Sequence, residues 1–246
     1  MFPIRDHNPS SRTPWVTYAL VAANVVVFLF QWRFADNGPA LSDFYDRWAL
    51  IPAAVTYDGA YQQLFTSMFL HAGFMHIGGN MLFLWIFGDN LEDQMGHAPY
   101  LIFYFACGLA AGLTQVLTDP ASTTPTVGAS GAIAGVMGGY LLLFPRARVD
   151  ILVIFIIFFR VFSIPAFLLL GLWFGLQVLG EFDSRGATGG IAYLAHIGGF
   201  LAGLLLTMPL WLWRGGPGFW QTNGGQPPHP AAIYSASTIP IVRRRK

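Results

Sequence analysis

Long apolar runs separated by short polar links dominate the sequence, and they predict helices that cross a membrane. A helix needs about 20 mostly apolar residues to span a hydrocarbon core of roughly 30 Å. Five runs approach or exceed that length, over residues 15–34, 74–95, 98–118, 128–145 and 191–213. The link 119–126, DPASTTPT, is turn-rich, and the longer link 35–65 mixes aspartates with aromatic residues that suit a membrane surface.

Residues 151–180 form a longer apolar-rich stretch that one straight crossing cannot hold. As a single helix it would measure about 45 Å. Pro165 divides it, after the polar Arg160 and Ser163. The first piece, 151–162, would be about 18 Å long as a helix, too short to cross, whereas 164–180 would be about 25 Å long and can cross. We therefore predict one span over 164–180, with 151–162 lying at the membrane surface or re-entering, and six spans in all.

Composition supports a polytopic membrane protein. Hydrophobic residues make up 54% of the 246 residues and charged residues only 10%, against roughly 25% charged in soluble domains. The lipid bilayer is thus the first expected partner, and the length suggests one compact domain. A formal net charge of +1 points to no nucleic acid or acidic partner. The single cysteine, Cys107, excludes an intrachain disulfide and a multi-cysteine metal site.

Basic residues divide unevenly between the two sides of the predicted six spans. Of the 13 Lys and Arg residues, only Arg33, Arg47 and Arg185 fall on the side away from the termini, which leaves ten on the terminal side. By the positive-inside rule both termini are cytoplasmic. The expected division is a loose polar N-terminus over 1–13, a membrane domain over 14–213, and a disordered basic tail over 214–246 that ends in RRRK.

Four polar residues lie inside the apolar segments and carry the functional hypothesis. Ser130 lies in the glycine-rich run TVGASGAIAGVMGGY, His76 and Asn80 lie four residues apart in the second span, and His196 lies in the last. A lone serine in a helix usually bonds back to its own helix, but polar groups in lipid are costly and indicate function. Counted from the cytoplasmic helix ends, Ser130 and Asn80 lie about 22 Å up and His196 about 25 Å up. Three helices therefore bring polar groups to one layer below the outer surface.

These residue types suit acyl transfer. A serine hydroxyl becomes a useful nucleophile when a base removes its proton, and histidine is the usual base. The reaction also needs donors for the developing oxyanion. Asn80 offers an amide, His76 a ring N–H, and Ser130 its own backbone N–H at the start of a helix. No Asp or Glu lies at this depth, so we expect a Ser130–His196 dyad rather than a triad.

Three motifs resemble the rhomboid family of intramembrane serine proteases over roughly residues 60–213. They are GASGAIAG around Ser130, HAGFMHIGGN ending at Asn80, and AHIGGFLAG around His196. The resemblance implies an all-α, six-helix membrane bundle, a Ser130–His196 dyad, and an oxyanion site from His76, Asn80 and Ser130. It also implies cleavage of transmembrane proteins near the outer face, without metal or cofactor. The expected location is the inner membrane of a bacterium.

Some positions of this sequence agree with the family's pattern and others differ from it. Glu92 and Gly96 fit a family Glu-x-x-x-Gly at the end of the second span. Some members carry an aromatic residue four positions after the serine, packed on the histidine, where this chain has Ala134. The Trp-Arg pair that many members have in the first loop is missing, since Ala49 follows Trp48. Gln177, in the fifth span, is polar and without an assigned role beyond a bond across helices.

Two other function classes fit parts of the pattern. The first is a catalytically inactive rhomboid-like protein that binds transmembrane clients, and the presence of all four polar residues argues against it. The second is a transporter with broken helices and polar sites at the midplane, which predicts a repeat between the two halves that the sequence does not show. For substrate access we expect the fifth span to be the adjustable wall and the loop 181–190 to act as a lid.

Overall fold

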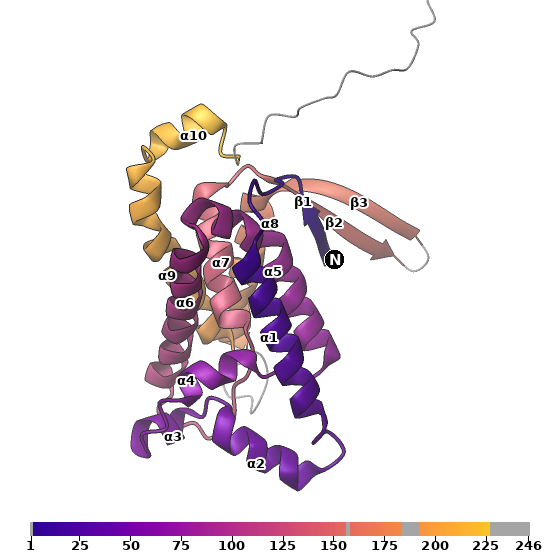
Figure 1. Cartoon of the computed structure of the whole chain (residues 1–246), viewed down its shortest axis with the longest axis vertical. Helices are drawn as coiled ribbons and strands as arrows, with labels where there is room; N and C mark the ends of the chain where they lie inside the picture. The colour runs from indigo at the N-terminus through magenta and orange to yellow at the C-terminus, as the bar shows by residue number, and fades with distance from the viewer. Residues whose placement is uncertain (1, 156–157, 184–191, 227–246) are drawn as a thin grey trace, which may run out of the picture.

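The computed structural model describes residues 2–155, 158–183 and 192–226 as a helical bundle with a small sheet at one end (Figure 1). The long helices are α1 (Trp15–Trp32), α5 (Phe74–Met95), α6 (His97–Thr118), α7 (Ser130–Leu143), α8 (Ala166–Asp183) and α9 (Tyr193–Trp213). At the end away from the sheet lie the short helices α2 (Gly38–Trp48), α3 (Pro52–Tyr57) and α4 (Gln63–Thr66), followed by a 3-10 turn over Ser67–Phe69.

The helices confirm a multi-pass membrane bundle and refine the predicted spans. Four helices, α1, α6, α8 and α9, are long and apolar enough to cross a membrane, and α5 passes the same test together with the segment Gln63–Phe69, from which it bends by 94°. Helix α7 is apolar but has only 14 residues, which is about 21 Å against a core of roughly 30 Å. Helix α7 alone is therefore too short to cross the core.

Helix α7 occupies the centre of the bundle, because small residues let its neighbours approach closely. Its residues from Gly131 to Tyr140 are all buried. Against it packs α9, and a Cβ added at Gly203 of α9 would lie 2.6 Å from the Cα of Gly135 in α7. The two backbones are thus in direct contact, as small residues spaced by four permit.

Residues 148–155 and 158–165 form two paired strands and not a helix. The position of 151–162 at the membrane surface or as a re-entrant segment stays a prediction. Strand β2 (Arg148–Phe155) pairs antiparallel with β3 (Phe158–Pro165), and β1 (Phe2–Asp6) pairs antiparallel with β2, in the order β1-β2-β3. The hairpin is rich in β-branched and aromatic residues, which favour strands. Each of its apolar runs is shorter than ten residues, and the pattern of so short a run cannot tell a strand from a helix.

The N-terminus is held by the sheet, in contrast to the predicted loose segment 1–13. Asp150 in β2 accepts hydrogen bonds from Arg5 Nε at 2.8 Å and from His7 Nε2 at 2.7 Å. Burial acts to raise the pKa of Asp150, but these two bonds hold that pKa below its ordinary value. The acidic side chain thereby ties the first residues of the chain to the central strand.

The segment after α9 is ordered further than predicted. Helix α10 (Pro217–Asn223) folds back on the bundle, where Trp220 Nε1 donates to the Leu142 carbonyl at 3.0 Å. The predicted disorder from residue 214 is therefore wrong as far as residue 226, and 227–246 lie outside the described residues. In the predicted lid 181–190, α8 continues to Asp183, while 184–190 also lie outside the described residues.

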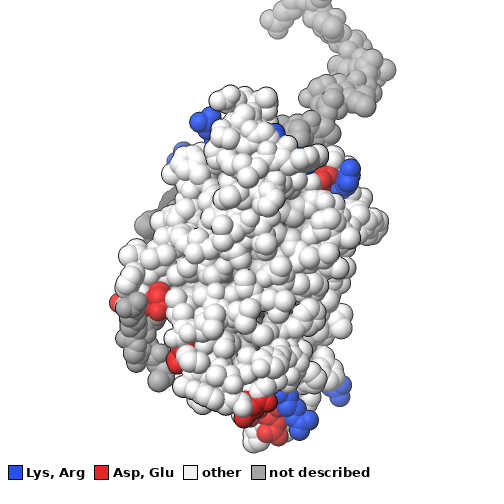
Figure 2. All heavy atoms as spheres, turned by 90° about the vertical axis from the view of Figure 1, so that its left-hand side faces the viewer, with Lys and Arg blue, Asp and Glu red and all other residues white. Residues whose placement is uncertain are grey.

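Charged side chains mark the two ends of the molecule. On the face shown in Figure 2, Lys and Arg lie toward the two ends, and between them the surface is mostly uncharged, with acidic groups along its left edge. Arg5 and Arg148 lie in the sheet, whereas Arg33 and Arg47 flank or end the helices at the opposite end of the bundle. This arrangement is the one that a membrane around the middle of the bundle requires.

Candidate active site

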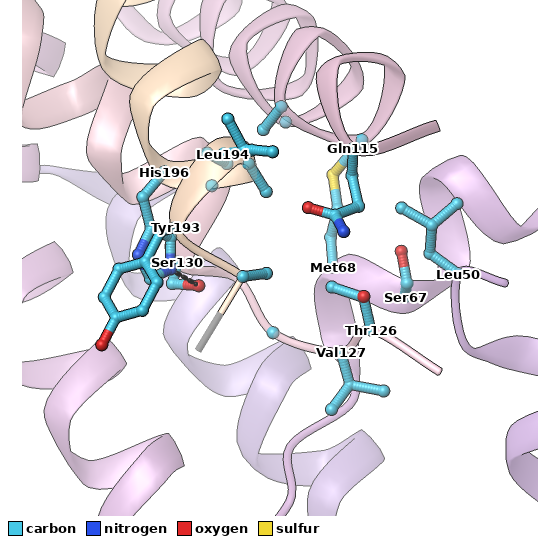
Figure 3. Close-up of a pocket in the computed structure, with 18 of the residues that line it drawn as sticks. Leu50, Ser67, Met68, Gln115, Thr126, Val127, Ser130, Tyr193, Leu194 and His196 are labelled. Carbon is cyan, nitrogen blue, oxygen red and sulfur yellow. Dashed lines mark hydrogen bonds between the residues drawn. The ribbon is translucent and has the colours of Figure 1, made fainter. Parts of the chain in front are cut away.

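Ser130 and His196, 66 residues apart, meet at the N-terminal ends of two central helices. Ser130 is the first residue of α7 and His196 lies in the first turn of α9. The Ser130 Oγ and the His196 Nε2 are 2.7 Å apart, and both side chains are half-buried (Figure 3). The close contact of α7 with α9 sets this distance, because both side chains project from the same packed pair of helices.

Gly128, two residues before Ser130, keeps open the space in front of the hydroxyl. Its φ is +132°, a backbone conformation that favours glycine. A Cβ there would lie 2.9 Å from His76 Nε2 and 3.4 Å from Ser130 Oγ. Any side chain at this position would therefore occupy the gap between Ser130 and His76.

His76 and Asn80 present hydrogen-bond donors to this gap from α5. The backbone N–H of Ala72 donates to His76 Nδ1 at 3.3 Å, so a neutral ring carries its proton on Nε2, the nitrogen that faces Gly128. Asn80 is 8% exposed, and its buried Nδ2 has no hydrogen-bond partner among the described residues. The first N–H groups of α7 also lack partners within their helix. The site thus offers several donors to one incoming oxygen.

A cavity of about 1280 Å³ connects these groups to one end of the molecule. Ser130, His196, His76 and Asn80 line it, as do polar residues of the link 118–126 between α6 and α7. Figure 3 shows Ser130 and His196 on one side of this space and Gln115, Ser67 and Thr126 on the other. The polar lining can carry water from that end of the molecule to Ser130.

Two residues of α8 contact His196. For Gln177 the sequence suggested only a bond across helices, and for Trp173 it suggested no role. Gln177 Oε1 lies 2.8 Å from His196 Nδ1. The Trp173 ring packs on the imidazole with centroids 5.8 Å apart. Trp173 supplies from α8 the aromatic contact that Ala134 cannot make. A polar residue in an apolar span was a signal for Gln177, whereas no local pattern distinguished Trp173 from lipid-facing aromatics.

Glu92 and Gly96 have a structural role remote from the dyad. Glu92 is 1% exposed and accepts the backbone N–H groups of Val16 and Thr17, each at 2.8 Å, at the start of α1. His97 Nδ1 lies 2.6 Å from the same carboxylate. Gly96 makes the turn between α5 and α6 with φ of +83°. Among the described residues, no group of three or more His, Cys, Asp or Glu side chains could hold a metal ion.

A family model described as the Rhomboid domain matches residues 58–213, which contain Ser130, His196, His76 and Asn80. The chain belongs to the rhomboid family. Similar proteins include the mitochondrial Rhomboid protein 1 of Saccharomyces cerevisiae, 31% identical over 77% of this chain and 51% of the yeast protein. Rhomboid protease GluP of Bacillus subtilis is 27% identical over 80% of this chain and 36% of GluP.

Another relative of this rhomboid comes from the same bacterium as GluP. Putative rhomboid protease YdcA of Bacillus subtilis is 31% identical over 52% of this chain and 56% of YdcA. The family resemblance seen in the motifs is thus confirmed, and relatives named as proteases are among the matches. The rhomboid chain spans about half or less of the length of the yeast protein and GluP.

Proposed function

We propose that this rhomboid is an intramembrane serine endopeptidase that cleaves transmembrane proteins with a Ser130–His196 dyad. One observation carries the proposal: the 2.7 Å contact between Ser130 Oγ and His196 Nε2 lies on the wall of a cavity that His76 and Asn80 also line, and the Asn80 Nδ2 has no hydrogen-bond partner among the described residues. A serine in contact with a base, next to a site for an oxyanion, is the arrangement that acyl transfer needs.

The chemical steps follow from this geometry. His196 Nε2 takes the proton of the Ser130 hydroxyl as the oxygen attacks the substrate carbonyl carbon. The carbonyl oxygen becomes negative and receives hydrogen bonds from His76 Nε2, Asn80 Nδ2 and the Ser130 backbone N–H. The positive end of the α7 dipole adds to this stabilisation. His196 then gives its proton to the leaving amine. In the second half, His196 takes a proton from a water molecule of the cavity as that water attacks the acyl-enzyme, and it returns this proton to the Ser130 oxygen as the acid product leaves.

Substrates of this site are transmembrane segments that unwind easily. Carbonyls of an intact helix in lipid are already hydrogen-bonded, so a segment with glycine, proline or small residues near the cut exposes its backbone at lower cost. The segment approaches between α5 and α8. After Leu170, the described part of α8 buries only Gln177. Helix α8 can therefore move away from the site with little loss of packing.

Orientation belongs to the same proposal. Both termini are cytoplasmic, because the basic residues concentrate at the end that holds the sheet and α10. The membrane of this proposal is the inner membrane of a bacterium. Ser130 then lies near the outer face, at the end of the bundle where the cavity meets the link 118–126.

A fluorophosphonate probe tests the nucleophile without knowledge of the substrate. The purified protein in detergent should be labelled, and mass spectrometry of its peptides should place the adduct on Ser130. Ser130→Ala, in which only the nucleophile is lost, should give no adduct. Absence of labelling in a folded wild-type protein would favour the catalytically inactive, client-binding alternative. An adduct on another serine would show that the dyad is misassigned.

A further inference from the structure

Gln177 is the one buried polar residue on a helix that otherwise faces outward. Helix α8 buries only Ala166 and Leu170 near its start and Gln177 further along. Its neighbour Leu176 is 53% exposed, as expected of a lipid-facing position. Burying an amide in apolar surroundings is costly unless it is hydrogen-bonded. The inward orientation of Gln177 therefore needs an explanation in its contacts.

The contacts of the Gln177 amide fix which of its ends faces His196. Its Nε2 donates to the backbone carbonyl of Trp173 at 3.3 Å, and a carbonyl can only accept. The other end, Oε1, therefore lies against His196 Nδ1 at 2.8 Å. An amide oxygen can only accept as well, so the proton between them belongs to His196 Nδ1.

This assignment determines the state of the other ring nitrogen. A neutral imidazole has one protonated nitrogen and one that accepts. With the proton on Nδ1, Nε2 is bare and accepts the hydroxyl proton of Ser130 across the 2.7 Å contact. The opposite tautomer would place an N–H against the hydroxyl and could not take its proton.

We infer that Gln177 is a positioning residue that holds His196 in the tautomer and orientation in which it activates Ser130. The inference rests on the proposed dyad and adds a third member, which acts through His196 and does not touch the substrate. When Nε2 takes the serine proton, Nδ1–H continues to donate to Gln177, so the ring keeps its place through the transfer. A buried carboxylate does this in serine protease triads and an amide does it in papain-like proteases. Here the amide comes from α8, beside the Trp173 ring that packs on the imidazole.

Gln177→Met tests the acceptor, because methionine is unbranched, similar in length and accepts only weakly. Losing a hydrogen bond of about 1–3 kcal/mol corresponds to a fall in kcat of about 5- to 150-fold for a transmembrane substrate. KM should stay within about twofold, since Gln177 does not contact substrate. The matched control is Leu176→Met, which introduces the same side chain one position away on the exposed surface, and it should cleave at the wild-type rate.

Gln177→Glu tests the role through the pH profile of activity, which would not change if Gln177 only supported the structure. Its carboxylate still accepts from Nδ1–H, so kcat should exceed that of Gln177→Met. A negative charge beside the imidazole favours the protonated ring, so the acid limb of the activity profile should move to higher pH. If the two variants lose activity equally, or if the acid limb of Gln177→Glu coincides with the wild type, the inference is overturned.

The outcome also separates this inference from the proposed function. Ser130→Ala should be inactive in the same assay. If Ser130→Ala still cleaves, the dyad itself is wrong. If Ser130→Ala is inactive while Gln177→Met keeps the wild-type kcat, the dyad stands and only the role of Gln177 is refuted. Should Gln177→Met lose its monodisperse elution profile, the pH profile of Gln177→Glu decides alone.

Discussion

Gly203→Ala should inactivate the enzyme by moving His196, although Gly203 lies two helical turns from the site. The added Cβ would lie 2.6 Å from the Cα of Gly135 and would also overlap the Gly135 carbonyl. Carbon atoms normally approach to about 3.5–4.0 Å. Both neighbours are backbone atoms in the middle of helices, so no side chain can rotate to make room, and α7 and α9 must separate.

The size of the effect follows from that separation. Moving the helices apart by about 1 Å restores ordinary contact, and it lengthens the Ser130–His196 distance from 2.7 Å to roughly 3.7 Å, beyond hydrogen-bonding range. A misplacement of this size costs about 100-fold in rate. Stability changes less, because overpacking costs about 1–3 kcal/mol while alanine gains about 1 kcal/mol over glycine in a helix.

Two measurements on the same preparation check this reasoning. Cleavage of a transmembrane reporter gives the rate, and thermal unfolding in detergent gives the stability. The matched control is Gly171→Ala in α8, where an added Cβ meets nothing within 4 Å, and it should keep the rate and gain up to about 1 kcal/mol of stability. A Gly203→Ala protein that cleaves at the wild-type rate would refute the claim that direct backbone contact sets the dyad distance.

Three further predictions concern other parts of the molecule. Glu92→Gln should lower the melting temperature by the equivalent of about 1–3 kcal/mol, because one of the backbone donors at the start of α1, such as Thr17 N–H, would face an NH₂ group; an unchanged melting temperature would contradict this. Burial raises the pKa of Asp6 to about 6, so the folded state holds a proton that the unfolded chain releases above about pH 4, and stability should fall as pH rises toward 6. Asp6→Asn keeps the acceptor for Tyr140 and should make the melting temperature nearly independent of pH in this range. If the melting temperature of Asp6→Asn depends on pH as the wild type does, another group causes the dependence. A cysteine at Arg243→Cys should react with an impermeant reagent only from the cytoplasmic side, and labelling from outside intact cells would reverse the proposed orientation.

Hydropathy and polar residues in lipid were enough to predict most of the membrane bundle and the meeting of Ser130 with His196. Both signals are local and strong, because apolar length determines a span and a buried polar group needs a reason. The depth estimate also placed His76 and Asn80 in the same layer, where the structure has them lining one cavity with the pair.

The β-sheet and the contacts from α8 could not be predicted in the same way. The stretch that holds β2 and β3 is apolar enough to resemble a partial span, and its strands are defined by pairing with each other and with β1, more than 140 residues earlier in the chain. The Gln177 contact depends on how α8 rotates about its axis relative to α9. That rotation is set by packing between helices, which the spacing of residues along α8 does not encode.

The central claim is intramembrane proteolysis by Ser130 and His196, and reconstituted cleavage tests it most directly. Wild-type protein and the Ser130→Ala and His196→Ala variants would be placed in liposomes with a reporter that has one transmembrane segment rich in glycine. We predict that only the wild type produces two fragments, and that mass spectrometry places the cut in the membrane-embedded part of the reporter, near the outer face. Fragments of the same mass from Ser130→Ala at the wild-type rate would contradict the account.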